Sequence, residues 1–297
     1  MSCGGCKDWS GPLSPIFDTI WLDVSGLGDS SLAAMALRSD TSTIPPELLL
    51  QAYRAGIFPM SDSRDDPEVY WVEPKMRAIL PLDGFHLSHS LARTLRRGRF
   101  RLSCNEAFDA VIDACAAPRA EAEDSWISQR ISESYRELHR HGHAHSIEAW
   151  RAGPHGTEVL VGGLYGVGFD RVFCGESMFS RASDASKVAL AGLVAALRRA
   201  GVELLDCQFT TPHLSSLGAV EIPQAEYIDR LQAATASQVG VSRADASPAG
   251  GTASAGAGAG TAGGLPAGFA ALLDDAAAAG LSSSPGNFIA QSLTQTS

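Results

Sequence analysis

A carboxylate and an amide lie two residues apart in a short apolar segment of this chain. Asp206 and Gln208 belong to Leu204–Phe209, which we expect to form a strand. Alternate residues of a strand point to one face of a sheet, so both side chains are expected on the same face. The carboxylate would orient the amide, whose oxygen accepts a proton or holds an amine. Such a pair suits a reaction that needs orientation more than strong proton abstraction.

A second polar site precedes this pair in the sequence. Glu176 lies in a Gly-Glu-Ser turn with Ser177 and is suited to hold a cation. The apolar residues expected to line a pocket beside these groups are Leu164, Phe173, Met178, Leu190, Leu193 and Leu205. Ordinary core packing is the alternative for each of them and stays open at this point.

The elements that must position these residues run from Val159 to Gln208. Three short apolar runs predict strands, namely Val159–Val161, Leu164–Val167 and Val172–Cys174. A helix follows, because apolar residues recur at helical spacing up to Leu197. Ser183 or Asp184 is its expected N-cap and Gly201 its expected stop. Strands, a helix and a last strand predict a site built on a rigid sheet.

Length and composition limit the other possibilities. The chain has 297 residues, a formal net charge of −10 and six cysteines. This charge argues against a protein that coats nucleic acid through its overall field, and the scattered cysteines do not resemble a disulfide framework. We see no secretory signal and no apolar run of membrane-spanning length. We therefore expect no membrane partner, and we expect a cytoplasmic location.

The composition also changes along the chain. Residues 1–40 are expected to be a poorly ordered extension, and residues 41–84 a small N-terminal α/β domain. Residues 85–235 would form the catalytic domain. From residue 236 to residue 297 Ala, Gly, Ser and Thr dominate, which predicts a disordered tail. A brief helix over Gly264–Leu281 is the alternative there, although a helix that short is marginal alone in water.

Five arginines between residues 93 and 101 are the strongest local concentration of positive charge. They are Arg93, Arg96, Arg97, Arg99 and Arg101. A solvated face and a phosphate-binding footprint are both open from the charge pattern alone.

Two patterns with metal-ligand residues are weak. Cys3 and Cys6 form a single Cys-x-x-Cys without a second pair, and alternating histidines follow from His139 to His145 without a carboxylate or cysteine to complete a set. We therefore expect no metal site.

The order of strands and helix resembles the acetyltransferase (GNAT-type) fold, so we expect an α+β protein with a mixed sheet. In that fold the loop before the long helix is a glycine-rich cradle for the pyrophosphate of coenzyme A. Here the loop is Ser180–Asp184, with no glycine and with an acid where a phosphate would lie. Coenzyme A is therefore not expected as the donor.

Long sequence blocks resemble the leucyl/phenylalanyl-tRNA–protein transferase family. They include Ala55–Met60, Tyr70–Pro74, Leu138–Trp150, Gly162–Val167, Phe173–Lys187, Leu204–Phe209 and His213–Pro223, in unbroken order across about residues 42–232. The resemblance implies an enzyme that transfers Leu or Phe, and Met less readily, from its tRNA to the α-amine of proteins starting with Arg or Lys. The product would be an N-end-rule degradation signal.

The same resemblance implies roles for individual residues. Leu164, Phe173, Leu190, Leu193 and Leu205 would hold the amino-acid side chain, with Ser177 and Met178 beside them. Trp71, Trp126 and Tyr135 would hold the terminal adenosine and the aminoacyl end. Glu176 and Gln208, supported by Asp206, would handle the reacting groups, and Arg93, Arg96, Arg97 and Arg99 would contact the acceptor stem. Aminolysis of an aminoacyl ester is downhill, so no cofactor is expected; the enzyme is expected to be a monomer.

Two other functions are weighed against this one. A coenzyme-A-dependent N-acetyltransferase is disfavoured by the missing glycine cradle. A non-catalytic module that binds tRNA or degradation signals would not need Asp206 and Gln208, and both are present.

Overall fold

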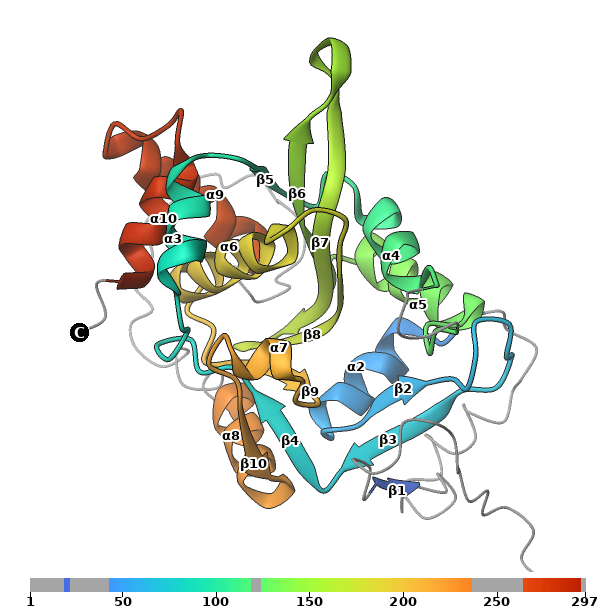
Figure 1. The fold of residues 1–297 in the computed structure, drawn as a ribbon. Helices are drawn as coiled ribbons and strands as arrows, with labels where there is room; N and C mark the ends of the chain where they lie inside the picture. The colour runs from blue at the N-terminus through green and yellow to red at the C-terminus, as the bar shows by residue number, and fades with distance from the viewer. Residues whose placement is uncertain (1–18, 22–42, 119–123, 237–263, 295–297) are drawn as a thin grey trace, which may run out of the picture.

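The computed structural model describes residues 19–21, 43–118, 124–236 and 264–294 (Figure 1). Cys3 and Cys6 therefore lie outside the described residues, as does most of the expected N-terminal extension. No helix within the described ranges is long and apolar enough to cross a membrane.

A seven-stranded mixed sheet forms the centre of the molecule, in the order β10-β4-β9-β8-β7-β6-β5. Its strands are β4 (Met76–Ile79), β5 (Arg101–Cys104), β6 (Ala144–Ala152), β7 (Glu158–Phe169), β8 (Val172–Ser180), β9 (Leu204–Gln208) and β10 (Val220–Pro223). Only β8 and β9 are parallel in this sheet. A parallel pair needs a crossover connection, and the helix α6 (Ala185–Arg199) supplies it.

The expected α+β fold with a mixed sheet is confirmed. The first two expected strands are one long strand, β7, because the glycines between the two apolar runs continue the ladder with β6 and β8. Gly162 also lies against α6, where a Cβ would come within 2.6 Å of Ala185. The glycines therefore mark close helix packing and do not break the strand.

A small second sheet carries the N-terminal elements, in the order β1-β3-β2. It contains β1 (Thr19–Trp21), β2 (Phe58–Met60) and β3 (Tyr70–Pro74), and the helix α2 (Pro46–Arg54) precedes β2. The structure differs here from the expected division at residue 84. β4 follows β3 almost directly, yet it pairs with β9 and β10 in the large sheet.

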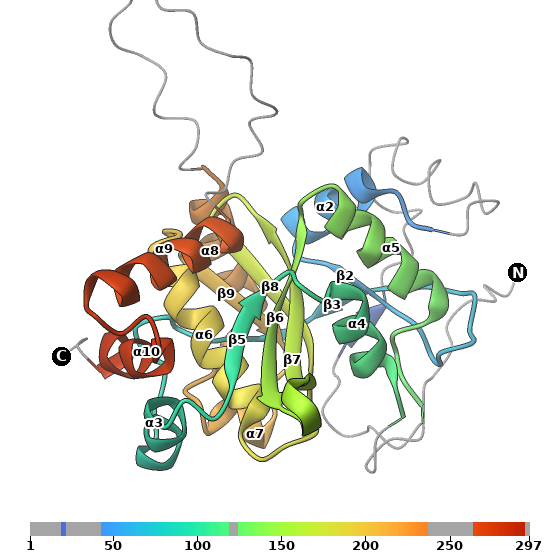
Figure 2. The same ribbon diagram turned by 90° about the horizontal axis from the view of Figure 1, so that it is seen from above.

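The remaining helices cover both faces of the large sheet (Figure 2). They are α3 (His89–Arg96), α4 (Phe108–Ala116), α5 (Gln129–Arg140), α7 (Pro212–Ser215), α8 (Gln224–Ala236), α9 (Leu265–Ala278) and α10 (Pro285–Thr294), with a short 3₁₀ turn at Pro154–Gly156. α6 packs on β6, β7 and β8 from one face, and α4 packs on the same strands from the other. Two apolar cores result, one on each face.

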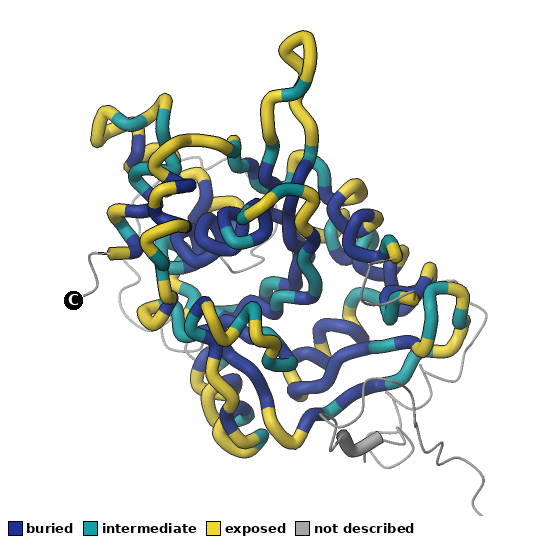
Figure 3. The backbone as a smooth tube through the Cα atoms, in the orientation of Figure 1, coloured by how far each residue is buried: buried dark blue, intermediate teal, exposed yellow. Residues whose placement is uncertain are grey.

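Figure 3 shows that the chain is buried along α6 and the central strands and exposed at the tip of the β6–β7 hairpin. α6 begins after Asp184, whose backbone is left-handed at φ 68° and whose side chain makes no capping hydrogen bond. Asp184 is thus the N-cap residue, as one of the two expectations had it, but its side chain does not cap the helix, and the alternative cap at Ser183 is wrong. The hydroxyl of Ser180 instead accepts a hydrogen bond from the N–H of Ser186.

The expectation of a disordered tail is wrong for residues 264–294, and the alternative of a brief helix over Gly264–Leu281 is confirmed by α9. α9 packs on α6, and α10 packs on α3 and α6. Leu265, Phe269, Leu272, Ile289 and Leu293 are buried in the core on the α6 face. A short helix is marginal alone in water, but here its apolar residues find a partner surface that composition does not reveal.

Candidate functional site

The site lies where β8 and β9 stop pairing. Their parallel register ends at Cys174 and Asp206, and Glu176 and Gln208 come just beyond this point. Glu176 is also the extra residue of a bulge, because Tyr165 pairs with Ser177 and Gly166 pairs with Gly175. A bulge redirects a side chain and often lies next to an active site.

Gln208 also has an unusual backbone. Its φ of 56° is in the left-handed region, which costs free energy for a non-glycine residue. The carboxylate Oδ1 of Asp206 accepts the Gln208 backbone N–H at 2.8 Å and so supports this conformation. Both candidate catalytic side chains are thus set by irregular backbone.

Glu176 and Gln208 form a hydrogen-bonded couple. The amide Nε2 of Gln208 donates to Oε1 of Glu176 at 2.8 Å, and the Tyr135 hydroxyl donates to Oε2 at 3.0 Å. The Tyr135 hydroxyl also shares a 2.5 Å hydrogen bond with the Tyr53 hydroxyl. Glu176 and Gln208 are 8% and 6% exposed, so the couple lies just below the surface.

Burial raises the pKa of Glu176 to about 7, against the lowering effect of its tyrosine hydrogen bonds. Burial raises the pKa values of Tyr53 and Tyr135 well above normal, so both stay neutral. Glu176 therefore exchanges a proton near neutral pH, which is the property of an effective general base or acid.

Asp206 supports the couple differently from the sequence-based expectation. Its carboxylate does not bond the side-chain amide of Gln208; it holds the backbone N–H and forms a two-point ion pair with Arg77. Arg77 Nε and Nη2 lie 2.9 and 2.6 Å from the two carboxylate oxygens, and both side chains are fully buried. Asp206 therefore contacts Gln208 through its backbone N–H and not through its side-chain amide.

Arg77 links this point to the N-terminal elements. Its Nη1 donates to the carbonyl of Gly56 at 3.0 Å, and its guanidinium lies over the rings of Phe58 and Tyr227. Burial lowers the pKa of Arg77, but the charge of Asp206 outweighs this and the net direction is upward. The Tyr227 hydroxyl donates to the same carboxylate at 3.1 Å.

Sequence reasoning missed Arg77, Tyr53 and Tyr227 as parts of the site. Arg77 stands at the start of an otherwise apolar strand, and a buried charge there needs a partner. This signal predicts a buried ion pair, although not which acid forms it. The two tyrosines carry no comparable signal, because each occupies an apolar position of a helix.

The apolar residues expected to form a pocket lie together. Leu164, Phe173, Leu190, Leu193 and Leu205 are all buried in the core on the α6 face, and half-buried Met178 packs against it. Ser177 is half-buried beside Glu176 on β8. This arrangement is compatible with both open interpretations, a side-chain pocket and ordinary core.

The three aromatic residues expected to hold an adenosine differ in exposure. Trp71 lies on β3 with 9% of its surface exposed and belongs to the core on the α4 face of the large sheet. Trp126 is half-buried and packs against that same core. Tyr135 is completely buried behind Glu176. Its hydroxyl bonds Glu176 and its ring has no exposed face, and its expected role at the adenosine and aminoacyl end stays a prediction.

The arginines occupy one end of α3 and the following turn. Arg93, Arg96, Arg97 and Arg99 are exposed. Arg101 differs, because it pairs with Glu106 and Glu158. Four of the five arginines thus present their charge to solvent.

The N-terminus of α6 carries an acid, as the sequence indicated. Asp184 accepts a hydrogen bond from Thr94 at 3.3 Å and lies 3.8 Å from Lys187. This carboxylate occupies the helix end that would have to receive a pyrophosphate. The geometry therefore argues against coenzyme A as donor.

Two of the histidines from His139 to His145 make side-chain contacts that hold the fold. His139 stacks on Phe108 and bonds the carbonyl of Ala144, and His145 bonds Asn105. Among the described residues no group of three or more His, Cys, Asp or Glu side chains is placed to hold a metal ion.

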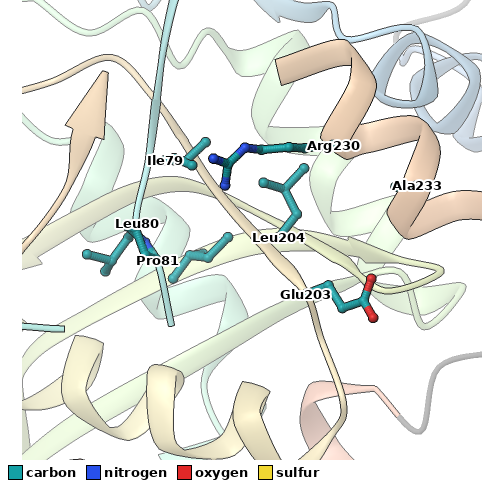
Figure 4. A pocket seen from close by; sticks show the side chains of 8 residues that line it. Ile79, Leu80, Pro81, Glu203, Leu204, Arg230 and Ala233 are labelled. Carbon is teal, nitrogen blue, oxygen red and sulfur yellow. The ribbon is translucent and has the colours of Figure 1, made fainter. Parts of the chain in front are cut away.

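A hollow of about 190 Å³ lies between β4, β9 and α8 (Figure 4). It is lined by Ile79, Leu80, Pro81, Glu203, Leu204, Leu205, Arg230 and Ala233. It shares only Leu205 with the expected pocket and contains neither Glu176 nor Gln208, so it is no part of this site.

Comparisons with known proteins identify the family. A model of leucyl/phenylalanyl-tRNA protein transferase matches residues 79–232, and a model of the N-terminal domain of that transferase matches residues 42–75. The chain belongs to the leucyl/phenylalanyl-tRNA protein transferase family. It is therefore an aminoacyltransferase, as its sequence blocks predicted.

Similar curated proteins carry the same name. A leucyl/phenylalanyl-tRNA–protein transferase of Novosphingobium aromaticivorans is 67% identical over 269 residues, covering 88% of this chain and 99% of the relative. One of Rhizorhabdus wittichii is 56% identical over 191 residues, covering 64% of this chain and 75% of the relative. One of Zymomonas mobilis is 56% identical over 197 residues, covering 66% of this chain and 72% of the relative.

Proposed function

We propose that this transferase moves Leu or Phe, and Met less readily, from the 3′ end of tRNA to the α-amine of proteins that begin with Arg or Lys. The product would carry an N-end-rule degradation signal. The Glu176–Gln208 couple at the end of β8 and β9 is the observation that carries the proposal, because it joins a neutral-pH proton acceptor to an oriented amide.

In the proposed reaction the amine nitrogen attacks the ester carbonyl carbon. The bond between that carbon and the ribose oxygen then breaks, and the amine loses a proton. The carboxylate of Glu176 accepts this proton and passes it to the departing ribose oxygen, which leaves as the hydroxyl of the tRNA 3′ end. Gln208 keeps Glu176 in place and orients the amine. Asp206 and Arg77 position Gln208 from behind.

The apolar cluster supports the choice of amino acid. A pocket formed by Phe173, Leu190 and Leu193 suits an unbranched or γ-branched side chain, and β-branched Ile or Val would be crowded near the ester. Size alone discriminates by about 1–3 kcal/mol. We propose Ser177 and Met178 at the edge of this pocket, with Leu164 and Leu205 at its base.

Trp71 and Trp126 are proposed to hold the terminal adenosine, and the four exposed arginines of α3 and its exit to contact the acceptor stem. Aromatic faces stack on bases, and guanidinium groups bind phosphate oxygens at two points. Aminolysis of the ester is downhill, so the proposed reaction needs no cofactor. We propose that it takes place in the cytoplasm, with the enzyme as a monomer.

The test is transfer of radiolabelled Leu from Leu-tRNA to a peptide that begins with Arg, without ATP or coenzyme A. A peptide that begins with Glu is the control. We expect label on the first peptide only. Acetyl transfer from acetyl coenzyme A would instead support an acetyltransferase, and tRNA binding without either transfer would support a binding module.

A further inference from the structure

α9 and α10 lie outside the two segments, 42–75 and 79–232, that the family models match. Nothing in the proposed reaction uses them. They are nevertheless packed on two functional elements, α6 of the apolar cluster and α3 of the exposed arginines. Figure 1 shows the pair, in red, beside α3 and α6.

α9 is fixed to the C-terminal half of α6. Gly268 lies so close to α6 that an added Cβ would come within 2.3 Å of the carbonyl oxygen of Ala196. Arg199 of α6 bonds Asp275 of α9 at 2.8 Å, and its guanidinium lies over the ring of Phe288 on α10. One arginine of α6 therefore contacts both added helices.

α10 is fixed to α3 in the same way. An added Cβ at Gly286 would lie 2.5 Å from the carbonyl oxygen of Leu95, in the last turn of α3. Arg198 of α6 bonds the carbonyl of Leu82 before α3 at 2.7 Å and the carbonyl of Ser292 on α10 at 3.2 Å. α10 packs on α3 more extensively than α6 does.

α3 depends on such support. It spans only eight residues, and helices of that length are marginal alone in water. Arg93, Arg96 and Arg97 lie within five positions and repel one another. Leu91 and Leu95 supply the buried side of the helix, and they belong to the same core as Ile289 of α10.

We propose that the α9–α10 pair positions α3, so that its exposed arginines meet the tRNA backbone in a fixed arrangement. This role rests on the proposed contact of these arginines with tRNA. Pre-organised arginines lose less conformational entropy on binding phosphate, so the affinity for tRNA increases. The pair acts on binding of charged tRNA and not on the chemical step.

The test is Gly286→Ala in the full chain, which places a methyl group against Leu95. We expect the KM for Leu-tRNA to rise about threefold or more with kcat within about twofold, because ground-state positioning is lost and the couple is intact. Amide exchange over Leu91–Arg97 should accelerate. Ile289→Ala, which removes apolar packing without a clash, should act in the same direction and serves if Gly286→Ala does not fold.

Two controls separate the explanations. Gln291→Ala changes an exposed residue of α10 and should alter nothing. Leu231→Ala removes a buried side chain of α8 in the other core, so it should lower the melting temperature with KM unchanged. Unchanged KM in both α10 variants, or an equal rise in KM in Leu231→Ala, would overturn the proposal, as would a loss confined to kcat.

The same assay with Arg96→Ala/Arg97→Ala tests the underlying function separately. If that variant leaves the KM for tRNA unchanged, the proposed tRNA contact fails. If it raises KM while the α10 variants do not, only the positioning role fails.

Discussion

At the scale of single residues, the site depends on a hydrogen bond between two side chains that irregular backbone brings together. Gln208 has a left-handed backbone and Glu176 is a bulge residue, and the amide of one bonds the carboxylate of the other. Such local strain persists only where the surroundings enforce it. Arg77 and Asp206 provide this enforcement.

Replacing Gln208 by Ala removes the group that orients Glu176 and the amine. We expect kcat for Leu transfer to fall about 100-fold or more, with the dissociation constant for Leu-tRNA changed by less than about threefold. Single-turnover transfer and filter binding measure the two quantities. Equal losses in both would assign Gln208 to binding alone.

The pH dependence of transfer should follow Glu176. Its pKa in the folded chain is about 7, so the carboxylate form increases as the pH rises from 6 to 8 and kcat should rise with it. The substrate α-amine titrates at about 7.7–8.0 and contributes to the same profile. Glu176→Gln should remove only the component near 7; a profile identical in both enzymes would contradict the role of Glu176.

The raised pKa of Glu176 makes the stability of the fold fall with rising pH, whereas kcat is expected to rise. The folded carboxyl keeps its proton between its ordinary pKa of 4.5 and about 7, where the unfolded chain has released it. The tighter binding of this proton by the folded chain stabilises the fold at low pH. This part of the free energy of unfolding is therefore lost as the pH rises through about 7. Activity and stability thus respond to Glu176 with opposite signs.

Arg77→Met should destabilise the fold, because it leaves the fully buried carboxylate of Asp206 without its partner. Removing one member of a buried ion pair costs about 3–5 kcal/mol. Urea denaturation measures the change. Adding Asp206→Asn should recover part of the loss, since it removes the unpaired charge; no recovery would show that Arg77 acts through packing.

At the scale of elements, β8, α6 and β9 form the unit that builds the site. The parallel pair holds Phe173 and Leu205 on the α6 face and ends where Glu176 and Gln208 begin. The crossover helix α6 covers the apolar cluster and carries Arg198 and Arg199, which contact the C-terminal helices. A substitution at the end of β8 or β9 is therefore expected to disturb both the apolar cluster and the Glu176–Gln208 couple.

α3 is the second element with a predicted role. Arg96→Ala/Arg97→Ala should raise the KM for charged tRNA and flatten its dependence on salt, because fewer counterions are released when the complex forms. For single-stranded ends or duplex, each lost phosphate contact changes the slope of log K against log salt by about 0.7–0.9. Measurements from 50 to about 200 mM salt suffice. An unchanged slope would exclude this patch from tRNA binding.

At the scale of the whole molecule, residues distant in sequence meet at the site. Tyr53 comes from α2, Arg77 from β4, Tyr135 from α5 and Tyr227 from α8. The small N-terminal elements are thus joined to the large sheet through the carbonyl of Gly56 and the rings around Arg77. The C-terminal helices α9 and α10 pack on α6 and belong to the core on the α6 face of the large sheet.

Local chemistry and periodicity determined much of this protein from the sequence alone. The helical repeat of apolar residues predicted α6, and the apolar segment Leu204–Phe209, with Asp206 and Gln208 two residues apart, predicted β9. Sequence blocks indicated the family, which the comparisons confirmed. These features are short-range, so spacing along the chain is enough to find them.

Only the tertiary structure decided which partners the polar groups take. Asp206 bonds Arg77 across 129 positions of sequence, and Tyr135 lies behind Glu176 instead of facing solvent. α9 and α10 become ordered because α6 and α3 bury their apolar residues, although their own composition predicts disorder. Long-range packing sets these outcomes, since burial and pairing depend on the surfaces that the fold brings together.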